Sequence, residues 1–180
     1  MKFKAEIADE DKIRRTLVRI AYQIIEKNHG VNDVCLIGIK TRGVPLAKRI
    51  SENIKVSEDI DVQTGELDIT LYRDDLAETR PEPSVNSTNI PFPVKNKNIV
   101  LVDDVIFTGR TARAAMDAVM RLGRAKTIQL AALVDRGHRE LPIRADFVGM
   151  NIPTSKNEVV CVHLFETDKE TNIQLFDKTL

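Results

Sequence analysis

Residues 99–111 read Ile99-Val100-Leu101-Val102-Asp103-Asp104-Val105-Ile106-Phe107-Thr108-Gly109-Arg110-Thr111, and this stretch decides the fold. Its apolar start predicts a strand over 99–102, which delivers Asp103 and Asp104 at its C-terminal end. A turn of threonine and glycine then opens a predicted helix over 111–122, which Gly123 ends. A buried strand followed directly by a helix is typical of an α/β protein with a parallel sheet.

The alternation of strands and helices continues in both directions from this stretch. Apolar residues at three- and four-residue spacing predict a first helix that Asp9 caps and Gly30 ends. A further helix is predicted over 44–54. Apolar runs typical of strands lie at 34–39, 67–71, 127–134 and 159–164. This order predicts an α/β fold in which helices cover both faces of a mainly parallel sheet.

Composition limits the class of protein. At 180 residues we expect a single domain over 1–180. The 27 basic and 27 acidic side chains balance, so any contact with nucleic acid must come from a local patch. Cys35 and Cys161 lie in apolar runs and are expected to be free core thiols of a reducing compartment. We find no membrane span and no signal-peptide core, so we expect a cytoplasmic protein.

One polar segment, 72–93, interrupts the pattern. It holds four of the seven prolines, namely Pro81, Pro83, Pro91 and Pro93. Proline disfavours both helix and central strand. A long irregular insertion in one domain is typically functional. We therefore predict a flexible lid over 72–93, with Tyr72 and Arg73 at its base.

The turn after the two aspartates is suited to a phosphate group. Backbone N–H groups and hydroxyls from Thr108 to Thr111, at the positive end of a helix, form a cradle for a dianion. Asp103 and Asp104 can accept hydrogen bonds from ribose hydroxyls or help to hold a metal ion. The stretch therefore indicates a sugar phosphate, although a solvated turn is the alternative. It matches neither the dinucleotide fingerprint nor the P-loop.

This stretch resembles the signature of type I phosphoribosyltransferases, which join a nitrogenous base to the ribose of phosphoribosyl pyrophosphate (PRPP). The resemblance implies the type I phosphoribosyltransferase fold, with a small hood beside the central sheet. It also implies that the aspartates hold the ribose hydroxyls, that 107–111 holds the 5′-phosphate, and that Mg²⁺ arrives with PRPP. The loop Lys40-Thr41-Arg42-Gly43 is similar to the family's pyrophosphate loop. Arg73 is a further candidate for a pyrophosphate contact; the alternative is a surface arginine.

Phe107 bears on the choice of base. Purine-salvage members of the superfamily carry an acid at this position, which takes a proton from the purine ring, and phenylalanine cannot do so. The departure indicates a pyrimidine. Phe107 is expected to pack on that base, and the alternative is a place in the buried core.

The resemblance extends along nearly the whole chain to the bifunctional pyrimidine operon attenuator and uracil phosphoribosyltransferase family. The further segments that carry it are 8–15, 68–76, 133–146 and 151–155. It implies that uracil and PRPP give UMP and pyrophosphate, and that UMP or UTP promotes binding to pyrimidine-operon leader mRNA. It also implies a homodimer or higher homo-oligomer. The candidate catalytic residues are Asp103, Asp104 and Arg73. The candidate substrate-binding residues are Lys40, Thr41, Arg42, Gly43, Asp103, Asp104, Val105, Ile106, Phe107, Thr108, Gly109, Arg110, Thr111, Asp135, Arg136 and Val160.

The RNA-binding face is only partly present. Its candidates are Arg15, Arg19, Tyr22, Arg139 and Arg144. Where RNA-binding relatives usually have threonine, histidine and lysine, this chain has Val18, Tyr22 and Met150. Tyrosine can still stack on an unpaired base, but valine and methionine cannot replace polar contacts. Two alternatives therefore stay open: a salvage enzyme that has lost RNA binding, and a regulator whose enzymatic activity is vestigial.

Overall fold

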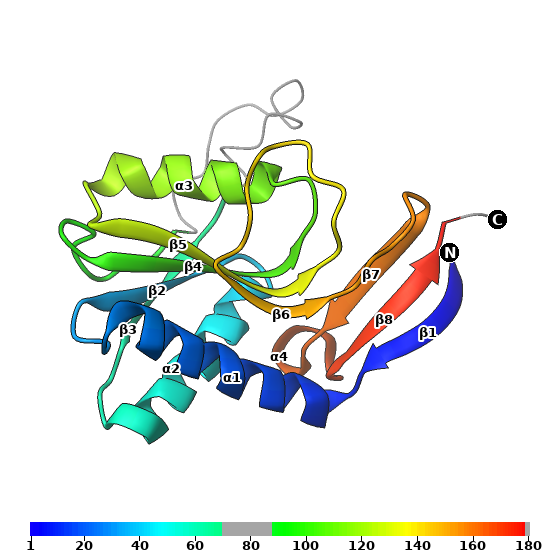
Figure 1. Cartoon of the computed structure of the whole chain (residues 1–180), viewed down its shortest axis with the longest axis horizontal. Coiled ribbons are helices and arrows are strands. Elements are labelled where there is room, and N and C mark those ends of the chain that lie inside the picture. Colours follow the sequence, from blue (N-terminus) through cyan, green and yellow to red (C-terminus); the bar gives the residue numbers. More distant parts are fainter. Residues whose placement is uncertain (70–87, 179–180) are drawn as a thin grey trace.

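Five strands form the parallel sheet that the sequence predicts. The computed structural model describes residues 1–69 and 88–178. Within them the sheet has the order β3-β2-β4-β5-β6 (Figure 1). The strands are β2 (Val34–Ile39), β3 (Gln63–Leu67), β4 (Asn98–Ile106), β5 (Thr127–Asp135) and β6 (Phe147–Asn151). The α/β prediction is confirmed.

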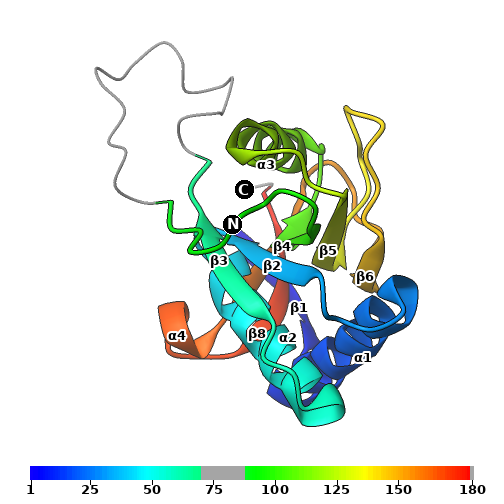
Figure 2. The same cartoon turned by 90° about the vertical axis from the view of Figure 1, so that its left-hand side faces the viewer.

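Helices cover both faces of this sheet. α1 (Glu10–Asn28) and α2 (Gly43–Glu58) lie on one face and α3 (Arg110–Leu122) on the other (Figure 2). Asp9 caps α1 as predicted, because its side chain accepts a hydrogen bond from the backbone N–H of Lys12 at 2.8 Å. At the other end, His29 takes the left-handed conformation and the chain leaves the helix at Gly30.

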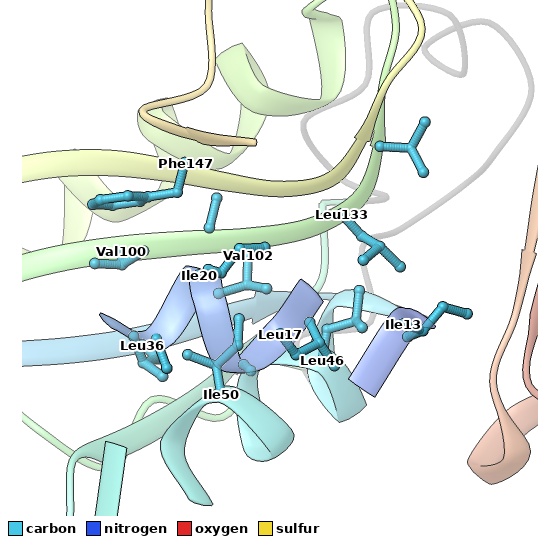
Figure 3. Packing of buried hydrophobic residues seen from close by; sticks show 14 of the residues in the cluster. Ile13, Leu17, Ile20, Leu36, Leu46, Ile50, Val100, Val102, Leu133 and Phe147 are labelled. Carbon is cyan, nitrogen blue, oxygen red and sulfur yellow. The ribbon is translucent and has the colours of Figure 1, made fainter. Parts of the chain in front are cut away.

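The core explains why the strands read as continuous apolar runs. Neighbouring residues of β4 face opposite ways. Val100 and Val102 pack with α1 and α2 (Figure 3). Ile99 and Leu101 pack on the α3 side. All six residues of β2 are buried. A strand that is buried on both faces needs apolar side chains at every position, so its pattern does not alternate.

A second, antiparallel sheet forms the hood. Its order is β1-β8-β7, with β1 (Lys2–Ala8), β7 (Glu158–His163) and β8 (Asn172–Asp177), and the short helix α4 (Phe165–Asp168) connects the last two strands. The sequence places the 159–164 run in the parallel sheet, and that assignment is wrong. The hood strands are half exposed, so charged residues interrupt their apolar pattern. The sequence prediction accordingly misses β1 and β8, as it misses the short edge strand β6.

Two boundaries also differ from prediction. The strand expected at 67–71 is β3, which ends at Leu67 because it pairs with β2 only as far as Ile39. The predicted lid falls mostly on 70–87, outside the described residues, together with Tyr72 and Arg73. Its last part, 88–93, is described: Asn89 exchanges backbone hydrogen bonds with Glu66 at 2.7 and 2.8 Å, and Phe92 is buried, so this part is anchored to the domain.

Candidate active site

The site lies at the point in the sheet where the connections between strands change direction. β3 lies on one side of the β2–β4 pair, and β5 and β6 lie on the other. Connections that leave two neighbouring parallel strands in opposite directions open a crevice at the carboxyl ends of those strands. The 40–43 loop follows β2 and the 107–111 loop follows β4, so the topology brings both predicted loops to this crevice.

β4 extends further than its neighbour. It pairs with β2 only as far as Val102, opposite Gly38, but continues beside β5 to Ile106. Asp103 and Asp104 are therefore held within a strand, whereas the sequence predicts that the strand stops before them. The end of β2 leaves one edge of this segment without a neighbouring strand. Strand geometry thus fixes the carboxylates at the crevice.

The pyrophosphate-type loop packs tightly against β4. A Cβ atom on Gly43 would lie 2.2 Å from the carbonyl oxygen of Val102, and one on Gly38 would lie 2.5 Å from the carbonyl oxygen of Gly43. The peptide bond between Lys40 and Thr41 is cis. Only glycine leaves room for this approach, which puts the start of α2 directly beside the aspartates.

The two aspartates differ in environment. Asp103 is buried, and its Oδ1 accepts a hydrogen bond from the N–H of Asp104 at 3.0 Å. Burial, and next the neighbouring charge of Asp104, raise the pKa of Asp103 well above its ordinary value. Asp104 is half-buried and accepts from the N–H of Val105 at 2.8 Å. Asp104 is thus the carboxylate more accessible to a ligand.

Arg42 joins the pyrophosphate-type loop to the hood. Its Nε and Nη2 donate to the two carboxylate oxygens of Asp168 at 3.0 and 2.6 Å. Asp168 also accepts from Thr167 Oγ1 at 2.7 Å and from the N–H of Leu164 at 2.9 Å. The hydrogen bond from Arg42 is the main cause that lowers the pKa of Asp168, and the same bond raises the pKa of Arg42. Asp104 contributes a smaller attraction to Arg42.

We expect Asp168→Asn to change the acid stability of the protein. A carboxyl whose pKa is lowered by folding stabilises the fold above its unfolded pKa, near 3.9, and this stabilisation is lost as the pH falls below that value. At pH 7 the variant should lose about 1.5–3 kcal/mol, which is usual for a hydrogen bond to a charged group. Below about pH 4 the difference from the wild type should shrink. Urea unfolding between pH 3 and 7 measures this; a constant difference would contradict the role of Asp168.

The 107–111 loop has the backbone of an anion cradle. Gly109, with φ of 93°, is the N-cap of α3, and as a glycine it offers no capping side chain. The hydroxyl of Thr108 accepts from the N–H of Arg110 at 3.3 Å. The first turn of α3 thus presents backbone N–H groups and a positive dipole end, as the phosphate prediction requires. The side chain of Thr111 belongs to this first turn and is half-buried.

Phe107 and Arg136 stack at the far end of the crevice. The guanidinium of Arg136 lies 4.1 Å from the centre of the Phe107 ring. Arg136 is buried and donates to the carbonyl of Glu158 at 2.6 Å and to Thr154 Oγ1 at 3.3 Å. Burial lowers the pKa of Arg136. Phe107 itself is 37% exposed, so the alternative of a buried core position is wrong.

Two cavities adjoin these loops. One of about 370 Å³ lies beside the Phe107 stack and is lined by Asp135, Arg136, Gly137, His138, Asn151, Pro153 and Thr154. The other, of about 570 Å³, lies between the pyrophosphate-type loop and α4, and its lining includes Lys40 and Thr41. Val160 lines neither cavity; it is buried in the core on the α1 side. Cys35 is buried as predicted, whereas Cys161 is only half-buried and close enough to Arg42 and Asp104 to feel both charges.

The candidate RNA residues divide into engaged and available groups. Arg19 donates to the carbonyls of Val148, at 3.3 Å, and Gly149, which fastens α1 to β6. Arg15 pairs with Asp11 at 3.0 Å and stays exposed. Tyr22 is 58% exposed. Arg144 is exposed and makes no hydrogen bond or ion pair within the described residues. Arg139 is engaged inside the protein.

A metal would have to share its ligands with a substrate. In residues 1–69 and 88–178 we find no group of three or more His, Cys, Asp or Glu side chains that could hold a metal ion. The pair Asp103 and Asp104 fits Mg²⁺ only in the form in which one or two carboxylates supplement phosphate oxygens. No helix of the described residues is long and apolar enough to span a membrane.

Comparison with known proteins decides the family. The phosphoribosyl transferase domain matches residues 4–166. Relatives named bifunctional protein PyrR, from Clostridium novyi and Oceanobacillus iheyensis, are each 58% identical over 99% of this chain and 100% of the relative. The relative of that name from Caldicellulosiruptor saccharolyticus is 59% identical over 96% of this chain and 94% of its own. This chain belongs to the PyrR family.

Solved structures agree with the fold of this PyrR family member. A hypoxanthine-guanine phosphoribosyltransferase from Bacillus anthracis has a TM-score of 0.72 at 18% identity, over 97% of this chain and 98% of that chain. Hypoxanthine phosphoribosyltransferase from Trypanosoma cruzi has a TM-score of 0.76 at 18% identity, over 97% and 95%. The resemblance stated from the sequence and the type I phosphoribosyltransferase fold are both confirmed.

Sequence reasoning misses several residues of this PyrR-family site. Asp168 orients Arg42, and Thr154 and Glu158 fix Arg136. These residues come from the hood and from the segment before it, so no local motif joins them to their partners. The only available signal for Thr154 was its place in the 151–155 segment that carries the family resemblance.

Proposed function

We propose that this protein is a uracil phosphoribosyltransferase that also regulates the pyrimidine operon by nucleotide-dependent binding to leader mRNA. The observation that carries the proposal is the pair of loops at the β2–β4 crevice, in a chain that belongs to the PyrR family. One loop suits a 5′-phosphate and the other a pyrophosphate, and two carboxylates lie between them. The single domain over 1–180 and the cytoplasmic location are parts of this proposal.

The proposed reaction follows from the placing of charge. The 107–111 loop holds the 5′-phosphate, and Asp103 and Asp104 accept hydrogen bonds from the ribose hydroxyls. As pyrophosphate departs, the ribose carbon gains positive charge, which the Asp104 carboxylate stabilises. The departing pyrophosphate is bound by the 40–43 loop, which consists of Lys40, Thr41, Arg42 and Gly43. Arg73 is a further proposed contact. Asp103 or Asp104 would help to hold a Mg²⁺ ion that arrives with PRPP, and this ion would neutralise much of the charge of the leaving pyrophosphate.

The base site supports a pyrimidine. Phe107 offers an apolar face whose other side is covered by Arg136, and it has no proton-accepting group. Asp135 and Arg136 line the adjoining cavity of about 370 Å³ and are proposed to contact the base, whereas Val160 supports the site from the core. Turnover assays with PRPP should give UMP from uracil and no product from hypoxanthine. Turnover of hypoxanthine alone would overturn the proposed substrate.

We propose that the RNA face consists of the exposed side of α1 and the segment that holds Arg139 and Arg144. Arg15, Tyr22 and Arg144 remain available to phosphates and unpaired bases. Arg19 and Arg139 support this face from within. The proposed partners are leader mRNA, UMP or UTP, and further copies of this chain in a homodimer or larger assembly.

A salvage enzyme without RNA binding is the second candidate. The observation that favours it is the loss of polar groups at Val18 and Met150. A gel-shift titration against a pyrimidine-operon leader stem-loop, with and without UMP at fixed salt, separates the two functions. Binding that UMP strengthens supports the regulator. Binding no tighter than to an unrelated hairpin leaves the salvage enzyme.

A further inference from the structure

Arg139 contacts the 107–111 loop, which we call the phosphate loop, and holds it in place. Its guanidinium donates to four acceptors: the carbonyls of Phe107 (2.9 Å), Gly137 (3.3 Å) and Ile143 (2.8 Å), and the carboxylate of Asp135 (2.5 Å). Its side chain is only 19% exposed. A guanidinium has five N–H donors in one rigid plane, and most of these are occupied by the protein. Arg139 therefore connects segments of the fold instead of presenting a free cation.

The backbone repeats this connection. The carbonyl of Thr108 accepts from the N–H of Glu140 at 2.9 Å and from that of Leu141 at 3.1 Å. The carboxylate of Glu140 also pairs with Arg110 at 2.7 Å. Side chains of Leu141 and Ile143 lie within contact distance of the position that a Cβ on Gly109 would take. The segment 137–144, which we call the outer loop, thus lies directly against the phosphate loop.

This docking orients the peptide groups that would bind phosphate. In a trans peptide the C=O and the following N–H point in opposite directions. The carbonyls of Phe107 and Thr108 are turned toward the outer loop, so the N–H groups of Thr108 and Gly109 are turned away from it. Neither N–H donates to another group in 1–69 or 88–178. They are available to an anion.

We propose that Arg139 is a positioning residue that couples nucleotide occupancy of the phosphate loop to RNA binding by the outer loop; this inference rests on the proposed function. A phosphate that accepts hydrogen bonds from the N–H groups of Thr108 and Gly109 polarises the same two peptide groups. Their carbonyls become better acceptors for Arg139, Glu140 and Leu141. The outer loop, which carries the exposed Arg144 and His138, is then held in one conformation. RNA meets a surface that is already ordered, which lowers the entropy cost of binding.

The coupling is tested with variants that separate charge from geometry. Fluorescence anisotropy with a leader stem-loop, with and without UMP at fixed salt, measures the factor by which UMP strengthens RNA binding. In the wild type we expect a factor of about 5–150. In Arg139→Lys we expect the UMP factor to fall below about two, because an ammonium has only three donors at a single point and cannot reach all four acceptors of the guanidinium.

Arg144→Gln is the matched control. It removes an exposed cation of the same outer loop that makes no ion pair in the described residues. We expect it to weaken RNA binding by the same factor with and without UMP, which leaves the coupling intact. An unchanged UMP factor in Arg139→Lys overturns the proposal. Equal weakening by Arg139→Gln with and without UMP also overturns it, since Arg139 would then be a direct RNA contact.

A second measurement keeps the coupling separate from RNA binding. If the wild type binds no RNA, the regulatory function fails, and hydrogen exchange of the outer loop decides the coupling by itself. UMP should slow exchange of the 137–144 amides in the wild type and have little effect in Arg139→Lys. Equal slowing in both proteins overturns the role of Arg139. UMP affinity, measured in the same samples, confirms that both proteins are saturated.

Discussion

Asp104→Asn is expected to lower uracil phosphoribosyltransferase turnover about 100- to 1000-fold, the usual effect of removing one preorganised group that stabilises transition-state charge. The substitution keeps the shape of the side chain and its ability to accept from the N–H of Val105. It removes the negative charge that we propose stabilises the ribose carbon as pyrophosphate departs. Steady-state assays with saturating PRPP and uracil measure the effect, and thermal unfolding verifies that the fold is retained.

The matched control is Asp117→Asn on α3. Asp117 undergoes the same chemical change, but its side chain is 41% exposed and its partner is Arg113 on the same helix, at 3.6 Å. We expect unchanged turnover and a change in stability within about 0.5 kcal/mol, as for most surface substitutions. If Asp104→Asn also kept wild-type kinetics, the crevice would not be the active site.

Gly43→Ala is expected to destabilise the protein by about 3 kcal/mol or more, because overpacking against backbone is costly. The added Cβ would lie 2.2 Å from the carbonyl oxygen of Val102, in a central strand that neighbours fix on both sides. The start of α2 must move away, and the pyrophosphate-type loop moves with it. For a domain of this size the melting temperature should fall by about 6–12 °C. The affinity for PRPP should fall in the same variant.

Gly65→Ala provides the comparison for this substitution. Gly65 lies in the edge strand β3, and its added Cβ would lie 3.1 Å from Ile90 Cγ1 and 3.3 Å from the backbone atoms Asn89 O and Ile90 Cα. These neighbours need to move by only a few tenths of an ångström, so the cost should be about 1 kcal/mol, well below that of Gly43→Ala. Urea unfolding of both variants measures the contrast. Equal destabilisation would mean that the contact with Val102 is not what requires glycine at position 43.

The sequence predicts those parts of the fold in which burial is complete. β2 is found at its predicted limits because all six of its residues are buried, which requires an uninterrupted apolar run. β1 shows the opposite case. Its sequence alternates charged and apolar residues, and most of it is exposed. Such a half-exposed strand is recognisable only when its partner β8 is known, and that partner lies at the other end of the chain.

The candidate site likewise has parts that the sequence predicts and parts that it does not. The two proposed anion loops are local motifs, since each follows one strand and precedes one helix, and their place in the fold can therefore be predicted from local sequence. The partners of Arg42 and Arg139 are decided by tertiary structure. Asp168 is 126 positions from Arg42 along the chain. Arg139 is a surface-type residue in sequence, and only the position of the carbonyls around it shows that it is engaged.

The pairing of β1 with β8 sets an order for the maturation of the site on the ribosome. The five-stranded sheet is complete once Asn151 has been made, but β1 stays without a partner strand until residues 172–177 have emerged. Arg42 likewise waits for Asp168. A nascent chain can therefore build the nucleotide crevice early and finish the hood last. A prematurely released polypeptide that ends before Asp168 would carry both anion loops with Arg42 unanchored.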